Sequence, residues 1–253
     1  HRGPDDSGYY FDESIGIGHN RLSIIGLSDA GRQPFFSQKK DIIAVFNGEI
    51  YNYRFIKKQL ISLGYRFNGD SDGEIIPHLY KEKGLDFISE LDGMFSILVY
   101  DKNKRCIYLF RDQFGIKPLY YYVEENYLIF GSEIKSIIAS EMVKKKVDMQ
   151  AIHDFLSLSY VPEPQTGFDG IYALEPSHQL FFSDYKPTIK RYSPHEKKDY
   201  NFSNEKNIKN QCKRVIGDSV KKHMISDVPI GSFLSGGIDS SLVSFYANSF
   251  NPN

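Results

Sequence analysis

A series of short strand-like segments in the middle of the chain restricts its possible folds more than any other feature. Four apolar runs, separated by polar turns, have the composition of strands: 94–100, 107–110, 119–123 and 127–130. Helical spacing of apolar residues comes before this series, as in the face formed by Tyr53, Ile56 and Leu60. Antiparallel-looking strands grouped together, with helices outside the group, indicate an α+β layered domain and not alternating βαβ units.

A glycine loop near the end of the chain, 235–241, has the pattern of a phosphate-binding turn. The apolar run 228–234 predicts a strand before it, and apolar residues at helical spacing follow it. Its two glycines expose backbone N–H groups, and the start of a helix favours anionic oxygens. No Gly-Lys-Ser/Thr follows, so this is not the common P-loop. The residues that we expect to bind phosphate are Leu234, Ser235, Gly236, Gly237, Asp239, Ser240 and Ser241.

The composition is that of an ordinary globular protein. Of the 253 residues 41% are hydrophobic and 25% charged, and the net charge is −1. A charge so close to zero gives no reason to expect nucleic acid or an anionic membrane as a partner. We expect neither a signal peptide nor a membrane span, and hence a cytoplasmic protein. The two cysteines, Cys106 and Cys212, lie in apolar patterns and are interpreted as buried thiols of a reducing compartment.

A polar and charged stretch with Pro194 divides the chain. It predicts a linker over 193–204, between a first domain in 1–192 and a second region in 205–253. The second region begins with a well-patterned helix and leads to the glycine loop. We assign no metal ligands to either part.

Six short strings occur along the chain in a fixed order. They are HRGPD at 1–5, HNRLSI at 19–24, NGEIYN at 47–52, SDGE at 71–74, RDQFGIKPLY at 111–120 and SGGIDSS at 235–241. Any one of them is a weak signal, but six in order make coincidence remote. In this combination the chain resembles the glutamine-hydrolysing asparagine synthetases.

The resemblance implies a protein with two sites. Residues 1–192 would form a glutaminase (class II glutamine amidotransferase) domain with the four-layer α/β/β/α sandwich of N-terminal nucleophile enzymes, lacking its first strand and nucleophile. Residues 205–253 would be the start of an α/β ATP-pyrophosphatase domain. Such a ligase transfers ammonia from glutamine to β-aspartyl-AMP, which it makes from aspartate and ATP with Mg²⁺. A homodimer is compatible with the resemblance.

The resemblance also gives roles to individual residues. Arg21 matches the family's ligand for the glutamine α-carboxylate, a role that suits a planar bidentate donor. Asn47 and the Gly48 N–H match the oxyanion hole, where each donor contributes about 2.7–4 kcal/mol. Glu49 and Asp72 match acceptors for the substrate ammonium group. Taken singly, the same residues are also typical of an ion pair, a turn and a helix cap.

The chain departs from the family at both ends. The family's nucleophile is a cysteine at the mature N-terminus whose amino group acts as the base, and His1 does not match it. Most of the expected nucleotide pocket would follow the glycine loop. We therefore interpret the chain as a truncated fragment that hydrolyses neither glutamine nor ATP at a useful rate. Two alternatives stay open: a related ATP-dependent amidotransferase acting on another carboxylate, such as a sugar or cell-wall acceptor, and a non-catalytic glutamine-binding module.

Overall fold

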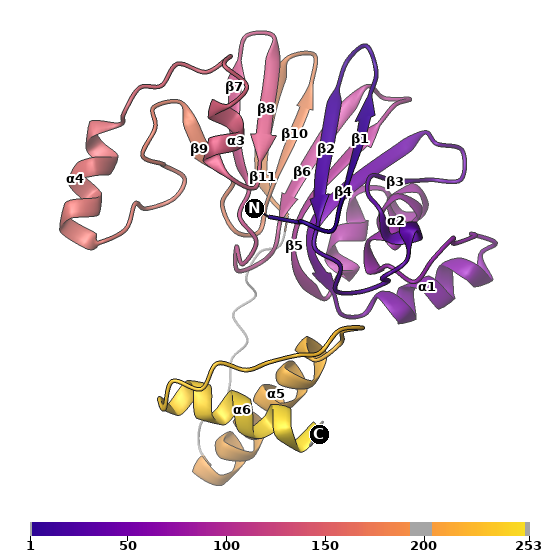
Figure 1. Ribbon diagram of the computed structural model, residues 1–253, viewed down its shortest axis with the longest axis vertical. Coiled ribbons are helices and arrows are strands. Elements are labelled where there is room, and N and C mark those ends of the chain that lie inside the picture. Colours follow the sequence, from indigo (N-terminus) through magenta and orange to yellow (C-terminus); the bar gives the residue numbers. More distant parts are fainter. Residues whose placement is uncertain (1, 193–203, 251–253) are drawn as a thin grey trace.

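The computed structural model describes residues 2–192 and 204–250 (Figure 1). All but the last residue of the expected linker 193–204 therefore lies outside the described residues. The first described range contains the sheets, and the second contains two long helices.

A six-stranded antiparallel sheet forms the centre of the first range. Its strands in spatial order are β11 (Lys186–Arg191), β10 (His178–Ser183), β6 (Cys106–Arg111), β5 (Gly93–Asp101), β4 (Ile42–Ile50) and β3 (Phe35–Phe36). The two expected strands 94–100 and 107–110 are confirmed as β5 and β6, which pair directly. Strands β10 and β11, which come about 70 residues later in the chain, extend this sheet through the pairing of β10 with β6.

Alternation along β4 explains why both faces of this sheet are covered. Ala44 and Phe46 pack in a cluster with helices α1 (Tyr53–Ser62) and α2 (Ile75–Lys83), whereas Ile43 and Val45 belong to a second cluster on the opposite face. Successive side chains of a strand point to opposite faces, so one continuous apolar run supplies two cores.

A second β layer covers the opposite face. It consists of a two-stranded and a three-stranded sheet, whose strands are β1 (Asp6–Phe11), β2 (Gly16–Arg21), β7 (Tyr120–Glu124), β8 (Tyr127–Gly131) and β9 (Ile171–Ala173). Ile17 of β2 and Tyr121 of β7 share a core with Leu109 of β6. Helix α3 (Ile134–Ile138) packs outside this layer, and α4 (Met149–Leu158) follows it. The expected α/β/β/α order is thus confirmed.

Three short 3₁₀ helices connect these elements: η1 (Asp29–Gly31), η2 (Asp72–Glu74) and η3 (Gly84–Glu90). The second leads directly into α2, where Pro77 occupies the first turn, a position that needs no N–H.

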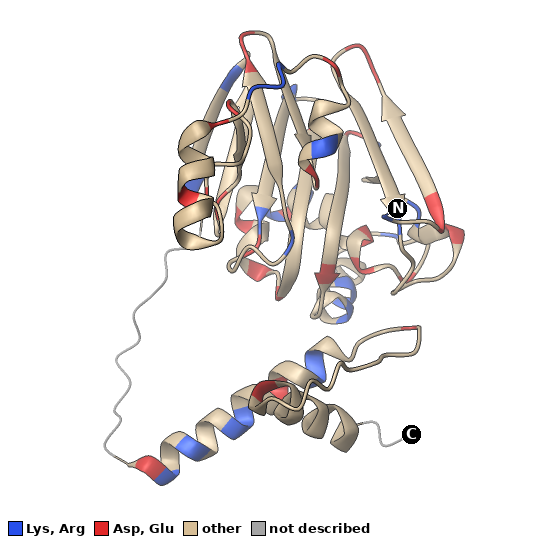
Figure 2. Cartoon of the chain, turned by 60° about the vertical axis from the view of Figure 1, so that its left-hand side comes forward, with Lys and Arg blue, Asp and Glu red and all other residues tan. Residues whose placement is uncertain are grey.

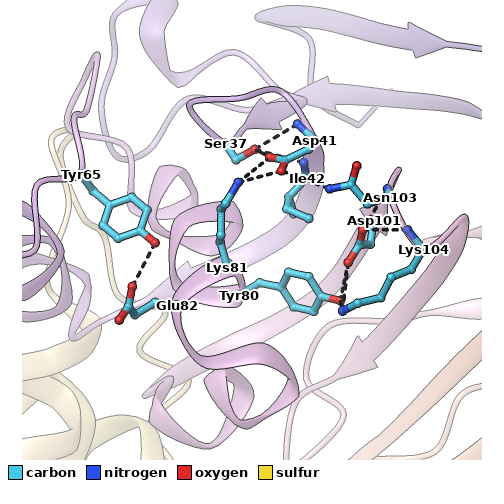
Figure 3. A network of polar contacts seen from close by, with 10 residues as sticks. All are labelled: Ser37, Asp41, Ile42, Tyr65, Tyr80, Lys81, Glu82, Asp101, Asn103 and Lys104. Carbon is cyan, nitrogen blue, oxygen red and sulfur yellow. Dashed lines mark hydrogen bonds and ion pairs between the residues drawn. The ribbon is translucent and has the colours of Figure 1, made fainter.

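Polar contacts hold α2 against the end of the central sheet (Figure 3). Lys81 Nζ donates to both carboxylate oxygens of Asp41, at 2.9 and 2.7 Å, and Ser37 Oγ donates to the same group at 2.6 Å. The Tyr80 hydroxyl donates to Asp101 at 3.1 Å. Because η2 leads into α2, this network also fixes the turn that carries Asp72.

The second range contains α5 (Glu205–His223) and α6 (Ile238–Phe250), which pack together apart from the sheets (Figure 1). Lysines and arginines recur along α5 (Figure 2). The strand predicted for 228–234 is wrong: this stretch is irregular. Within the described part of the chain no strand lies beside it, and an extended segment without a hydrogen-bonding neighbour forms no sheet.

The two cysteines differ in their surroundings. Cys106 is buried in β6, as expected, whereas Cys212 is exposed on α5, so its predicted burial is wrong. The apolar pattern of α5 is only partly covered, with Gly217 and Val220 as its buried residues. Helices α1 to α6, taken over the described ranges, are each too short or too polar to cross a bilayer.

Candidate active site

Strand β4 carries three of the predicted glutamine-site residues. It continues through the Asn-Gly pair because Asn47, Gly48 and Glu49 pair with Ser96, Phe95 and Met94 of β5. A Cβ atom added at Gly48 would lie 2.1 Å from the Met94 carbonyl oxygen. The residue at this position is therefore restricted to glycine by the close approach of β5.

Arg21 ends β2 and is 7% exposed. Its Nη1 donates to the Ser28 carbonyl at 3.1 Å, and its Nη2 donates to the carbonyls of Ile25, at 3.3 Å, and Gly26. The loop that follows β2 thus surrounds the guanidinium group of Arg21 with its carbonyl oxygens. Three of the guanidinium's five N–H groups are used in this way, so Nε–H and one Nη1–H have no partner among these loop carbonyls.

Asp72 lies in η2 and is almost fully buried. Its Oδ2 accepts the Ile50 N–H at 2.9 Å and its Oδ1 accepts the Gly73 N–H at 3.0 Å. Burial and the nearby Glu49 carboxylate raise the pKa of Asp72 to about 7, although these hydrogen bonds oppose the shift. The side chain therefore joins η2 to the end of β4 and is not a helix cap.

Glu49 is half-buried beside Asp72. Burial raises the pKa of Glu49, and the nearby Lys117 and His223 partly offset this effect. Two carboxylates in one poorly hydrated place repel each other unless a cation lies with them. The pair is therefore suited to an ammonium group.

The sequence did not indicate the role of Gln33. Its side-chain amide donates to the Phe46 carbonyl at 3.0 Å and accepts the Phe46 N–H at 2.7 Å. These bonds fix β4 one residue before Asn47, whose own amide has a long contact of 3.5 Å with Ser132 Oγ. A glutamine that binds backbone in this way has no local sequence signal.

Gly26 connects the two halves of the predicted glutamine site. Its carbonyl accepts from Arg21, and a Cβ atom at Gly26 would lie 2.7 Å from the backbone nitrogen of Ser71, next to Asp72. The structure therefore brings the ends of β2 and β4 together with η2. A cavity of about 1050 Å³ is lined by residues such as Arg32, Gln33 and Lys40, and none of the residues predicted from the sequence lines it.

The predicted phosphate-binding residues lie together at the start of α6. Gly236 has φ of +84°, and the hydroxyls of Ser235 and Ser240 are 3.0 Å apart. Ser240 Oγ and the Ser241 N–H both donate to the Gly237 carbonyl, at 3.1 and 3.0 Å. This exposed turn fits a phosphate group. Over the described ranges, no three or more His, Cys, Asp or Glu side chains are grouped to hold a metal ion.

Comparison with known proteins agrees with this geometry. Residues 1–193 match the family model described as glutamine amidotransferase domain. The chain belongs to this family. Residues 211–253 match a second family model, described as asparagine synthase.

Curated relatives are similar to this chain over nearly all of its length. The chain is 41% identical to asparagine synthetase [glutamine-hydrolyzing] 1 of Bacillus subtilis, over 100% of this chain and 40% of the relative. It is 35% identical to asparagine synthetase B [glutamine-hydrolyzing] of Escherichia coli, over 96% of this chain and 39% of the relative. The amidase chry2 of Gibberella zeae is 37% identical, with 96% and 36% covered. The chain thus spans about two fifths of their length, and the resemblance seen in the sequence is confirmed.

A solved structure shares the fold. The structure of the allosteric regulatory enzyme of purine biosynthesis superposes with a TM-score of 0.51 at 19% identity, over 92% of this chain and 49% of that one. The layered arrangement of this chain is thus also found in a solved structure.

Proposed function

We propose that this chain is the glutamine-handling part of a glutamine-hydrolysing asparagine synthetase, together with the opening of the synthetase domain. The observation that carries the proposal is the convergence of Arg21, Glu49 and Asp72 at the meeting point of β2, β4 and η2. A cationic group at one side and two carboxylates at the other fit the α-carboxylate and ammonium ends of an amino acid.

The neighbouring strand supplies groups for the reaction. In the proposed complex, Asn47 and the Gly48 N–H face the side-chain amide of glutamine and stabilise the oxyanion of its cleavage. Burial raises the pKa of the Cys106 thiol and Cys212 lies on α5, so neither acts as the nucleophile. We propose that the chain binds glutamine and does not cleave it by itself.

The turn 235–241 forms the second proposed site, which binds ATP. We propose that its backbone and hydroxyl groups hold the phosphates of ATP in the whole protein, where Mg²⁺ would neutralise their charge. Ammonia from glutamine would then be transferred to the β-aspartyl-AMP formed there from aspartate. A cytoplasmic location and a homodimer belong to the same proposal.

Calorimetric titration of the chain with L-glutamine tests the first site. We expect saturable binding that D-glutamine does not reproduce and that Arg21→Ala abolishes. An ammonia-release assay should stay at the level of a heat-denatured control. Absence of L-glutamine binding would overturn the proposed function. Ammonia release above the heat-denatured control would overturn the proposal that the chain does not cleave glutamine by itself.

One observation supports a second candidate. The relative named amidase chry2 is about as similar to this chain as several relatives named asparagine synthetase. The acceptor could therefore be a carboxylate other than aspartate. Product analysis of a longer protein containing this chain, supplied with aspartate, glutamine and ATP, decides between them: asparagine supports the first function.

A further inference from the structure

The segment between α5 and the phosphate-binding turn contacts the amidotransferase domain at one backbone loop. The Asp227 N–H donates to the Ile24 carbonyl at 2.9 Å, and Asp227 Oδ2 accepts the Gly26 N–H at 2.7 Å. These bonds join residues about 200 positions apart, as the separation of 201 between Gly26 and Asp227 shows. One aspartate thus binds the loop at two points.

The loop that Asp227 holds is also the loop that surrounds Arg21. The Ile25 and Gly26 carbonyls accept from Arg21 Nη2 while the Gly26 N–H points to Asp227. Gly26 adopts φ of +67°, which glycine reaches without strain. On its remaining side it approaches Ser71, the residue before Asp72. Gly26 therefore links Asp227 to both ends of the proposed glutamine site.

We propose that Asp227 is a positioning residue for glutamine recognition. It fixes the loop 24–26 in the one shape that directs Arg21 towards the substrate carboxylate and sets the position of the Ser71–Asp72 turn. The inference deepens the proposed function and rests on it. It assigns to a residue of the second range a role in the first site.

The strength of these bonds makes the effect measurable. A hydrogen bond to a charged group is stronger than one between neutral groups, and removing the acceptor leaves the Gly26 N–H without this partner. The Ile25 carbonyl, which shares a peptide unit with the Gly26 N–H and accepts from Arg21, would then move. Small displacements of a positioned donor weaken recognition strongly. Loss of the carboxylate should therefore lower glutamine affinity and leave the sheets intact.

A second contact between the two ranges provides a matched control. Lys222 Nζ, near the end of α5, forms an ion pair with Asp92, which makes none of the hydrogen bonds to the loop around Arg21. Lys222→Gln removes this pair without touching Gly26. If the substitutions only loosened the contact between the two ranges, both Asp227→Ala and Lys222→Gln would weaken glutamine binding. A positioning role predicts weaker binding in Asp227→Ala alone.

The experiment compares Asp227→Ala, Asp227→Asn and Lys222→Gln in the whole chain. L-Glutamine dissociation constants come from calorimetry, and hydrogen exchange reports on the Gly26 amide in the absence of ligand. We expect Asp227→Ala to weaken glutamine binding about tenfold or more, a loss of about 1.4 kcal/mol. Asp227→Asn keeps an acceptor oxygen and should bind within about threefold of the unchanged chain, as should Lys222→Gln. Exchange at Gly26 should be faster only in Asp227→Ala.

Each outcome decides one question. Unchanged glutamine affinity in Asp227→Ala overturns the positioning role, and equal losses in Asp227→Ala and Lys222→Gln also overturn it. If the unchanged chain binds no glutamine, the proposed function fails. Hydrogen exchange at Gly26 then tests only the contact between Asp227 and the loop. Exchange that is no faster in Asp227→Ala than in the unchanged chain overturns this contact. Asp227→Lys, which also lacks an acceptor, replaces the alanine variant if the latter does not fold.

Discussion

The Asp72 carboxylate accepts the N–H of Ile50, the residue that follows Glu49 in β4, and burial together with the Glu49 carboxylate raises the pKa of Asp72. Two acidic groups thus share a site that is largely removed from water. Without a cation, protonation of Asp72 relieves their repulsion; with an ammonium group between them, both are stable as carboxylates. The arrangement therefore couples protons to substrate binding.

Glutamine binding should release protons near neutral pH. The ammonium group favours ionised Asp72 and lowers its pKa from about 7, so protons leave when the ligand binds at or below that pH. Calorimetry at about pH 6.5 in two buffers of different ionisation enthalpy measures the number released. Affinity should also fall as the pH decreases below about 7. An equal binding enthalpy in both buffers would contradict this prediction.

The substitution Asp72→Asn should stabilise the fold while removing glutamine binding. Burial first, and Glu49 in addition, raise the folded-state pKa of Asp72 above its unfolded value, so ionisation destabilises the fold as the pH rises from about 4 to about 7. We expect a gain of about 1–3 kcal/mol in the free energy of unfolding at about pH 8, disappearing near about pH 4. Urea unfolding at the two pH values measures it.

The exposed neighbour Asp70 provides the control for that measurement. Its hydrogen bond with Lys57 lowers the pKa of Asp70, so Asp70→Asn should give no gain at about pH 8. A stabilisation of the same size in both variants would show that the effect is not specific to the buried carboxylate.

Gly48→Ala should destabilise the domain because β5 leaves no room for a side chain. The added Cβ would meet the Met94 carbonyl at 2.1 Å, within the β4–β5 ladder. Overpacking of this kind costs about 1–3 kcal/mol in the free energy of unfolding. In the matched variant Gly167→Ala nothing lies within 4 Å, and the change should be within about 0.5 kcal/mol. Equal stabilities by urea unfolding would refute the steric restriction.

The sequence predicted those features that depend on local pattern. Apolar runs between polar turns located β5 and β6, and the strings around Arg21 and Asp72 contain residues that the fold brings near each other through Gly26. Contacts between distant segments left no such pattern. Gln33 binds the backbone of Phe46, and no spacing predicts a side chain that replaces ladder hydrogen bonds.

The wrong strand prediction has a related cause. The apolar run 228–234 has strand composition but is irregular, because β structure depends on a neighbouring strand and not only on its own residues. The hydrogen bond between Asp227 and Gly26 could not be predicted from the sequence either, because a single polar side chain that joins two distant segments leaves no sequence pattern.

Asp41→Asn should destabilise the fold at neutral pH but not in acid. Burial alone would raise the pKa of Asp41, but hydrogen bonds from Lys81 and Ser37 outweigh it and hold the pKa at about 2. A lowered folded-state pKa stabilises the fold above the unfolded value, so the contribution of about 2 kcal/mol is present at pH 7 and is lost as the pH falls from about 4 through about 2. Urea unfolding of the variant across this range should converge with that of the unchanged chain at the acid end. The exposed Glu125→Gln should show no comparable pH-dependent difference. A constant deficit at every pH would mean that Asp41 acts through packing and not through its charge.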